Sequence, residues 1–494
     1  MAKYETKNEE GETCEAKYLI VKAEMGGILD LLKLLVLNGG RVHEFVESSE
    51  VDGDGGGEWD SGGHRWVIVV SVIMRRIIGI LGKPMEGTGM VIEFLLNLLD
   101  LNGGIYGLFL NLIKGNVVRP ERGSDTYISA IGHLDSRLDL CREVSFLNLV
   151  GLDTGGKCGD RALMDLCILA SKLAYENANV VENIIVHRWK MHFVEFFNCW
   201  NDYQKKRSTQ VFILSDKPKD ATLVLISFRG TEPFDADDWS TDVDYSWYEI
   251  PKLGKVHMGF LEALGLGNRA QISTFQNYLQ PKNQANKDTA YYAVKSKLES
   301  LLHDHKDAKF VVTGHSLGGA LAILFPVVLL LHDEHELMKR LLAIYTFGQP
   351  RVGDENLVSF MKAQLCEPMP RYFRAVYCND IVPRLPYDDS TFLYKHFGLC
   401  LYYNSLYSEQ NVEEEPNRNY FGLRYLIPEH LNAVWELIRC LMISHVYGPE
   451  YEEGWFSIFI RVFGLFMPGV SAHSPRDYVN CVRLGRGRIQ MDSI

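Results

Sequence analysis

The sequence predicts an α/β fold, with a mostly parallel central sheet and helices on its faces. Three observations favour this class. From about Cys141 onward, short β-branched runs alternate with helical stretches, and strands separated by helices usually pair in parallel. One of these runs ends in a sharp glycine-rich turn that leads into an apolar helix, which is typical of such sheets. We find no internal repeat that would indicate a solenoid or a propeller.

The sequence divides into three parts. Residues 1–65 form an N-terminal segment that ends in a flexible acidic, glycine-rich linker, "ESSEVDGDGGGEWDSGG". Residues 66–120 form an apolar region. Residues 121–494 carry the α/β domain, whose expected strands include "TLVLISFRG", "KFVVTGHSLGG", "LLAIYTFGQP" and "RYFRAVYCND". A helical insertion is expected within this domain at about residues 400–470.

The composition excludes several classes of protein. A net charge of −12 over 494 residues argues against a nucleic-acid partner, because phosphate binding depends on clustered Lys and Arg. The ten cysteines form no CxxC pair and no zinc spacing, so free thiols in a reducing compartment are expected. The acidic start of the chain does not resemble a secretory signal. We therefore expect a protein on the cytosolic side, whose oligomeric state the sequence leaves open.

The apolar region predicts a helix that lies in a membrane surface. In "GMVIEFLLNLLDLNGGIYGLFLNLI", polar or small residues recur every three or four positions and form one helical stripe: Glu93, Asn97, Asp100, Gly104, Gly107 and Asn111. No window of about 18 residues is free of charge, which argues against a simple span. We expect the stripe to face water or head groups while the apolar remainder enters the acyl boundary.

Two other structures stay open for this region. The "NGG" at residues 102–104 could break the helix into a shallow hairpin, and Asn102 falls off the polar stripe. A packed helix of a soluble domain is the further alternative, because apolar runs alone do not separate core from membrane. The membrane interpretation is favoured by basic side chains that can reach anionic head groups, namely Arg65, Arg75, Arg76 and Lys83.

The glycine-rich turn contains the chain's only G-x-S-x-G, formed by Gly314, His315, Ser316, Leu317 and Gly318. Glycines at both ends allow a crowded strand-to-helix elbow that presents the serine hydroxyl, as in α/β-hydrolases. Ser316 is therefore the candidate nucleophile, and a helix start with a capping serine is the alternative.

A serine nucleophile needs a histidine base and an acid that orients it, and in α/β-hydrolases they follow in the order Ser, acid, His. Asp380 is the best acid because it stands just past a β-rich run, where a loop begins. Asp354 is the runner-up, and Asp388 and Asp389 lie further into the loop. His473 is the best base because it lies in a Gly-, Pro- and Ser-rich loop; the other downstream histidines are His396, His430 and His445.

Two backbone positions are candidates for holding an oxyanion. The N–H of Leu317, directly after the nucleophile, is one. The second is Thr231, because a strand ends at Phe228 and Gly230 lets the following backbone turn toward the site. An ordinary strand-to-loop turn is the alternative for this segment.

Six motifs resemble the class 3, or fungal-type, triacylglycerol lipases, in matching order over about residues 140–485. They are "SFRGTEPFDADDWSTD", "KVHMGFLEAL", "VTGHSLGGALA", "TFGQPRVGD", "YCNDIVPRLP" and "HSPRDYV". The apolar region further resembles that of the plant oil-body lipases. The resemblance implies an α/β-hydrolase fold with nucleophile Ser316, acid Asp380, base His473 and oxyanion residues Thr231 and Leu317.

The same resemblance implies the rest of the expected function. A lid is expected near residues 232–240, with Trp239 as its anchor. The implied activity is hydrolysis of tri-, di- and monoacylglycerols at the surface of lipid droplets, with the endoplasmic reticulum membrane as a further location. No metal and no organic cofactor are expected. The alternatives are a phospholipase A1 or galactolipase of the same fold, and a lipid-droplet scaffold whose catalytic site is vestigial.

Overall fold

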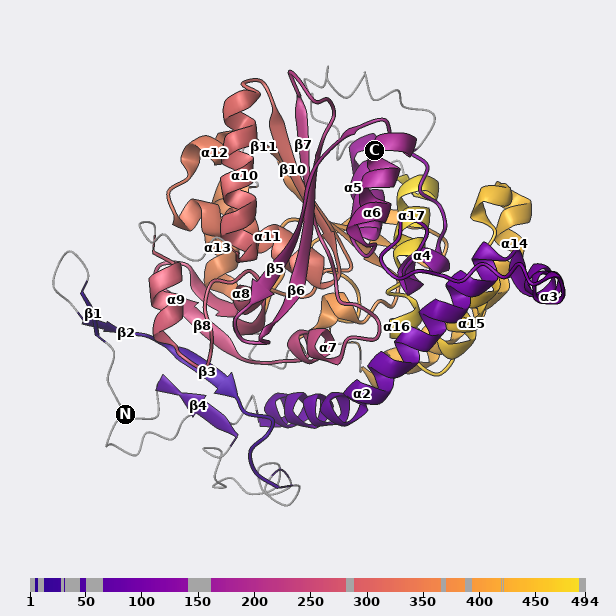
Figure 1. The fold of residues 1–494 in the computed structure, drawn as a ribbon. Coiled ribbons are helices and arrows are strands. Elements are labelled where there is room, and N and C mark those ends of the chain that lie inside the picture. The colour runs from indigo at the N-terminus through magenta and orange to yellow at the C-terminus, as the bar shows by residue number, and fades with distance from the viewer. Residues whose placement is uncertain are drawn as a thin grey trace, which may run out of the picture.

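The structure is a computed structural model that describes residues 5–7, 13–27, 31, 45–49, 65–140, 161–280, 288–365, 370–386, 393–418, 420 and 422–487. Its centre is a nine-stranded sheet in the order β15-β14-β13-β12-β11-β10-β7-β6-β5 (Figure 1). The strands are β5 (His192–Asn201), β6 (Lys206–Ser215), β7 (Leu223–Phe228), β10 (Lys309–His315), β11 (Leu341–Phe347), β12 (Tyr372–Tyr377), β13 (Leu399–Tyr403), β14 (Ser408–Val412) and β15 (Arg486–Gly487). The neighbours from β7 to β13 are parallel, as are β14 and β15, while β5–β6, β6–β7 and β13–β14 pair antiparallel. The prediction of a mostly parallel sheet is confirmed.

Helices cover both faces of this sheet because its central strands are apolar on both sides. Val224 and Ile226 of β7 belong to one core cluster, whereas Leu225 between them belongs to the other. The first cluster is covered by α8 (Met258–Ala263), α10 (Ala290–Asp304), α11 (Leu317–Leu331) and α13 (Glu355–Leu365), with α9 (Ser273–Tyr278) and α12 (His335–Lys339) nearby. The second is covered by α5 (Arg161–Leu173), α6 (Ala178–Asn183), the π-helix Ile184–Arg188 and α17 (Pro475–Leu484).

The N-terminal segment shares a small sheet with the α/β domain. Its strands β3 (Tyr18–Val21) and β4 (Val46–Ser48) join β8 (Trp247–Ile250) and β9 (Gly254–His257) in the order β4-β3-β8-β9. A separate hairpin pairs β1 (Glu5–Lys7) with β2 (Thr13–Glu15). Most of the acidic linker lies outside the described residues.

The apolar region folds as two helices joined by a tight turn. Helix α2 (Arg65–Leu101) ends where the sequence allowed a break, and α3 (Gly104–Lys114) follows. The side chain of Asn102 stabilises this turn, because its Nδ2 donates to the carbonyl oxygen of Val118 at 2.8 Å and its Oδ1 accepts from the N–H of Val118. Among the described residues, no helix is both long and apolar enough to span a bilayer.

The direction of the polar stripe was predicted wrongly for Glu93 and Asn97, whereas Asp100 is exposed as expected. Asn97 is 1% exposed and pairs with both backbone groups of Ile128, and the Glu93 carboxylate accepts from the N–H of Ala130. The polar residues thus satisfy the backbone of a neighbouring segment, while apolar residues of α2 face outward. Arg75 also turns inward, to Asp244 and the carbonyl oxygen of Val21, and Arg76 donates to backbone carbonyls of residues 23–26, so they do not supply the expected head-group contacts.

Four helices present most of the exposed apolar side chains among the described residues. They are α2, α3, α14 (Leu423–Tyr447) and α15 (Trp455–Phe463), which lie together on one side of the molecule (Figure 1). Short helices α4 (Ala130–Leu134) and α16 (Pro468–Ser471) pack among them. We call the exposed apolar side of α2, α3, α14 and α15 the apolar face. The expected insertion at about residues 400–470 starts with strands β13 and β14, and its helices begin with α14.

Candidate active site

The G-x-S-x-G turn is a strained elbow between β10 and α11. Ser316 adopts φ +59°, a left-handed conformation that a side-chain-bearing residue seldom takes. A Cβ on Gly314 would lie 2.1 Å from the carbonyl oxygen of Gly318, and a Cβ on Gly318 would lie 2.3 Å from the carbonyl oxygen of Phe228. Both glycines are therefore required for the elbow to pack against the end of β7, and the elbow places Ser316 at the start of α11.

The structure brings the predicted acid and base into contact. Asp380 follows β12, His473 lies between α16 and α17, and Nδ1 of His473 is 2.8 Å from Oδ2 of Asp380. Because a carboxylate only accepts, Nδ1 carries the hydrogen and donates it. Nε2 of His473 is buried and has no hydrogen-bond partner among the described residues, so it is the nitrogen left to accept a proton.

His315, inside the elbow, holds the loop that carries the predicted base, His473. Its ring packs against the His473 ring with centroids 4.5 Å apart, and its Nε2 is 3.0 Å from the carbonyl oxygen of His473. That oxygen accepts only, so Nε2–H donates to it and Nδ1 accepts from the hydroxyl of Tyr175 at 2.8 Å. Burial lowers the pKa of His315 well below its ordinary value, which keeps this residue neutral beside the base.

Thr231, the predicted oxyanion residue, lies in the loop after β7 and contacts Asp242, which the sequence did not single out. The hydroxyl of Thr231 donates to Oδ2 of Asp242 at 2.7 Å, so the backbone N–H of Thr231 is the group of this residue that stays a candidate donor for an oxyanion. Burial raises the pKa of Asp242 to about 7. Leu317 begins α11, so its N–H belongs to the first helical turn, where backbone donors lack partners within the helix.

Comparison with known proteins assigns the family. The model of the family "Lipase (class 3)" matches residues 225–390. The chain is 54% identical to the triacylglycerol lipase OBL1 of Nicotiana tabacum and 54% identical to that of Arabidopsis thaliana, in each case over 97% of both chains. The chain belongs to the class 3 lipase family. A solved structure of the Rhizomucor miehei lipase propeptide complex is 24% identical over 49% of this chain and 67% of that one, with a TM-score of 0.35.

The alternative residues for this class 3 lipase have other partners. Oδ1 of Asp354 accepts the N–H groups of Asn356 and Leu357, each at 3.1 Å, so it caps the start of α13. The ring of His396 is bonded to the carbonyl oxygen of Pro383 at 2.7 Å. His430 and His445 are exposed on α14, and Asp388 and Asp389 lie outside the described residues.

Two residues that the sequence did not single out lie against the predicted acid, Asp380, and the predicted base, His473. Tyr478 of α17 donates its hydroxyl to Oδ2 of Asp380 and is fully buried. Gly348, with φ +59°, follows β11, and a Cβ there would lie 2.9 Å from both Oδ2 of Asp380 and Cε1 of His473. Their signals in the sequence were weak, because a Tyr in a helix and a Gly after a strand are both common.

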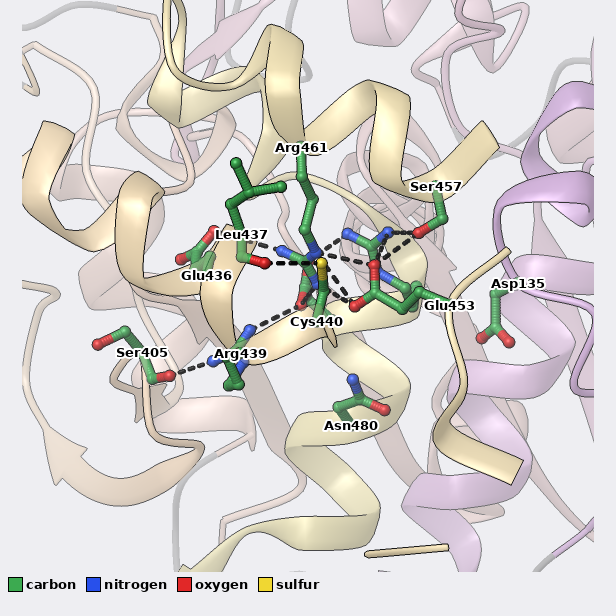
Figure 2. A network of polar contacts seen from close by, with 12 residues as sticks. Asp135, Ser405, Glu436, Leu437, Arg439, Cys440, Glu453, Ser457, Arg461 and Asn480 are labelled. Carbon is green, nitrogen blue, oxygen red and sulfur yellow. Dashed lines mark hydrogen bonds and ion pairs between the residues drawn. The ribbon is translucent and has the colours of Figure 1, made fainter. Parts of the chain in front are cut away.

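A buried network of charges anchors the helices around His473. The Arg461 guanidinium of α15 donates to the Glu453 carboxylate at 2.7 Å (Figure 2). It also donates to Oδ1 of Asp477 in α17 at 2.9 Å. The positive charges of Arg461, Arg476 and Arg439 hold the pKa of Asp477 well below its usual range. Further members from α14 and α17 are Glu436, Arg439 and Arg476. The network joins α14 and α15 to the helix that starts two residues after His473.

The expected lid forms a short helix, α7 (Ala236–Asp242), preceded by a turn. Trp239 is half-buried and donates its indole N–H to the carbonyl oxygen of Pro233 at 3.1 Å. Of the three aspartates in the lid, Asp238 is buried against Arg229, and the other two pair with Lys206. The lid is therefore less negative toward solvent than its sequence suggests.

Proposed function

We propose that this class 3 lipase hydrolyses triacylglycerols, and also di- and monoacylglycerols, with Ser316, His473 and Asp380 as its catalytic triad. The observation that carries the proposal is the pair formed by His473 and Asp380, because the Nε2 of His473 is free and its ring packs against His315, the residue before the serine on the strained elbow. The name of the two relatives with 54% identity, triacylglycerol lipase, supports the substrate class.

The residues account for both halves of the reaction. Ser316 Oγ attacks the ester carbonyl carbon while His473 Nε2 takes its proton, and the N–H groups of Leu317 and Thr231 hold the oxyanion. The tetrahedral intermediate collapses, and His473 returns the proton to the departing alcohol, a diacylglycerol. Water then attacks the acyl-enzyme with His473 again as base, which releases the fatty acid and restores Ser316.

We further propose that the apolar face rests on the surface of lipid droplets. Trp455 and Phe459 of α15 are 63% and 60% exposed, and Ile80 of α2 is 76% exposed. So many large apolar side chains together are uncommon on the surface of a monomeric soluble protein. A droplet monolayer encloses an apolar core with no second aqueous side, so a face that inserts without crossing suits it. The same surface chemistry would serve on the endoplasmic reticulum membrane.

The test compares three substrates with one matched variant. Wild-type protein and Ser316→Ala are assayed on emulsified trioleoylglycerol, on phosphatidylcholine vesicles and on galactolipid micelles. We expect fatty-acid release from trioleoylglycerol by wild type only. A preference for phospholipid or galactolipid would reassign the lipase to those substrates. Undiminished activity of Ser316→Ala would contradict the proposed nucleophile, and absence of activity in the wild type would favour a scaffold protein.

A further inference from the structure

The predicted acid and base lie on two segments that are distant in the sequence. Asp380 follows β12, and its N–H donates to the carbonyl oxygen of Tyr377, the last residue of that strand, at 2.9 Å. His473 precedes α17, and the N–H of Asp477, in the first turn of that helix, donates to the carbonyl oxygen of Ser474 at 3.0 Å. Tyr377 and Asp477 are both fully buried, so each is a fixed point from which its segment can be held.

One arginine of the helical insertion contacts both of these fixed points. Nη2 of Arg439, on α14, donates to the hydroxyl of Tyr377 at 3.0 Å and to Oδ1 of Asp477 at 3.4 Å. The Tyr377 hydroxyl donates in turn to Oε1 of Glu436, about one turn earlier on the same helix, at 2.9 Å. Two side chains of α14 therefore bridge the segment that carries Asp380 and the segment that carries His473.

The second helix of the insertion supports this bridge. Arg461 of α15 donates to Oδ1 of Asp477 at 2.9 Å and lies 3.5 Å from Oε2 of Glu436. Glu436, Arg439 and Arg461 lie in one buried cluster (Figure 2). A buried ion pair contributes little net stability relative to apolar packing, so stability alone does not account for this cluster. Directed hydrogen bonds in a dry interior do, however, hold the groups that they join in one geometry.

The two sides of the insertion helices differ in chemistry. In the chain, α14 and α15 lie between Asp380 and His473. Their outer sides belong to the apolar face, which carries exposed residues such as Leu441 and Phe459. Their inner sides carry the charges of the bridge. The insertion can therefore act on the catalytic residues through one side while the other side meets the surroundings.

We propose that Arg439 is a positioning residue for the triad. Together with Glu436 and Arg461, it holds the two segments at the separation that lets His473 donate to Asp380. It contacts neither the substrate nor the reacting atoms. The insertion thereby completes the active site in addition to forming part of the apolar face. The inference rests on the proposed function, because it needs His473 to act as the base.

The first test removes one hydroxyl from the bridge and leaves every charge in place. Tyr377→Phe is compared with Tyr403→Phe, whose fully buried parent residue on β13 donates to the carboxylate of Glu409, also at 2.9 Å, outside the bridge. Both are assayed on a soluble short-chain ester, so binding to lipid plays no part. We expect Tyr377→Phe to lower kcat by about tenfold and to change KM by less than about twofold, and Tyr403→Phe to keep the wild-type kcat.

The pH profile separates positioning from a merely structural role. If the contact with Asp380 is loosened, the imidazolium ion of His473 loses part of its stabilisation, so the pKa of the base falls. We therefore expect the acid limb of kcat/KM to move to lower pH in Tyr377→Phe and to stay in place in Tyr403→Phe. A lower Tm in Tyr377→Phe, with the kcat and the pH profile of its control, would overturn the proposal.

The second test shortens the arginine. Arg439→Lys keeps the positive charge, but the shorter side chain ends in a single ammonium group that does not span Tyr377 and Asp477. The control is Arg483→Lys at the other end of α17, where Arg483 donates to Asp165 from two nitrogens. We expect kcat to fall by about tenfold in Arg439→Lys and to remain at the wild-type value in Arg483→Lys. Equal kcat values for the two variants would contradict the bridge.

A third measurement does not depend on activity. The Nδ1–H proton of His473, bonded to Asp380, should give a far-downfield ¹H NMR signal, identified by its loss in His473→Gln. We expect this signal to shift or broaden in Tyr377→Phe and to stay unchanged in Tyr403→Phe. An unchanged signal in Tyr377→Phe would refute the positioning. A wild type that hydrolyses no ester would instead refute the proposed function, and the signal can be compared in that case too.

Discussion

Replacing Tyr478 by Phe tests whether the second partner of Asp380 supports catalysis. The hydroxyl of Tyr478 accepts from the N–H of Tyr377 and donates to Oδ2 of Asp380, the oxygen that also faces Nδ1 of His473. Phe keeps the buried ring and removes the hydroxyl alone. Asp380 then retains the N–H of Val382, 2.9 Å from Oδ1, and the imidazole.

The expected loss follows from the charge of the acceptor. A hydrogen bond to an ionised group contributes about 1.5–3 kcal/mol. Because 1.36 kcal/mol corresponds to a factor of ten in rate, losing this contribution to the orientation of the base lowers kcat by about 10- to 100-fold. Tyr478 is fully buried behind Asp380, away from the substrate, so we expect KM to change by less than about twofold.

The control is Tyr407→Phe, which removes a buried hydroxyl that donates to Asp477 at 2.8 Å rather than to Asp380. Both variants are compared with wild type by thermal unfolding and by steady-state hydrolysis of one acylglycerol. Equal kcat values for the two variants would refute the reasoning, because loss of any buried Tyr–Asp bond would then have the same effect.

Three further changes have defined outcomes. Asp242→Asn removes a buried carboxyl whose pKa is raised from 3.8 to about 7. Between these two pH values the Asp242 carboxyl is protonated in the folded wild type and ionised in the unfolded chain. The free energy of unfolding of the wild type therefore falls by about 4 kcal/mol as pH rises from about 4 to 7. The Tm of Asp242→Asn relative to wild type should therefore rise between pH 5 and pH 8, and a constant difference would contradict the buried titration. Gly348→Ala adds a methyl group 2.9 Å from Asp380 and His473 and should lower kcat by about 100-fold. Its control is Gly123→Ala, which is also at positive φ but in open space and should keep the wild-type kcat. Phe459→Ser should weaken binding to phospholipid-coated triolein by about tenfold or more in a flotation assay, because the ring no longer enters the acyl chains, whereas Val186→Ser, outside the apolar face, should bind like wild type.

Local patterns predicted the central strands and the elbow well. The runs that end at Phe228, His315 and Phe347 are strands because β-branched and aromatic residues alternate between two buried faces. The strand, the glycine turn and the apolar helix around Ser316 are consecutive in the chain, so their arrangement is encoded locally. The contact between Asp380 and His473, 93 positions apart, is not encoded locally; its prediction rested on the order of the two residues, the loops around them and the resemblance to class 3 lipases.

The apolar helices show where the sequence was insufficient. The spacing of Glu93 and Asn97 defined a polar stripe on α2, but not which surroundings it faces. An apolar stripe gains as much from lipid as from a protein core, so the pattern is the same in both cases. The structure shows that Glu93 and Asn97 face protein, because their side chains form hydrogen bonds with the backbone of residues 128–130. Gly82 and Gly89 of α2 gave no signal either, because they lie against Ala236 and Phe234, which are distant in the sequence.

The most direct test of the triad is covalent labelling of the nucleophile. A long-chain alkyl phosphonate ester forms a stable bond to an activated serine and mimics the tetrahedral intermediate. We expect one phosphonate per chain, located on Ser316 by peptide mass spectrometry, and no labelling of Ser316→Ala. Labelling at another residue, or wild-type lipase activity after complete labelling of Ser316, would contradict the assignment of Ser316 as the catalytic nucleophile.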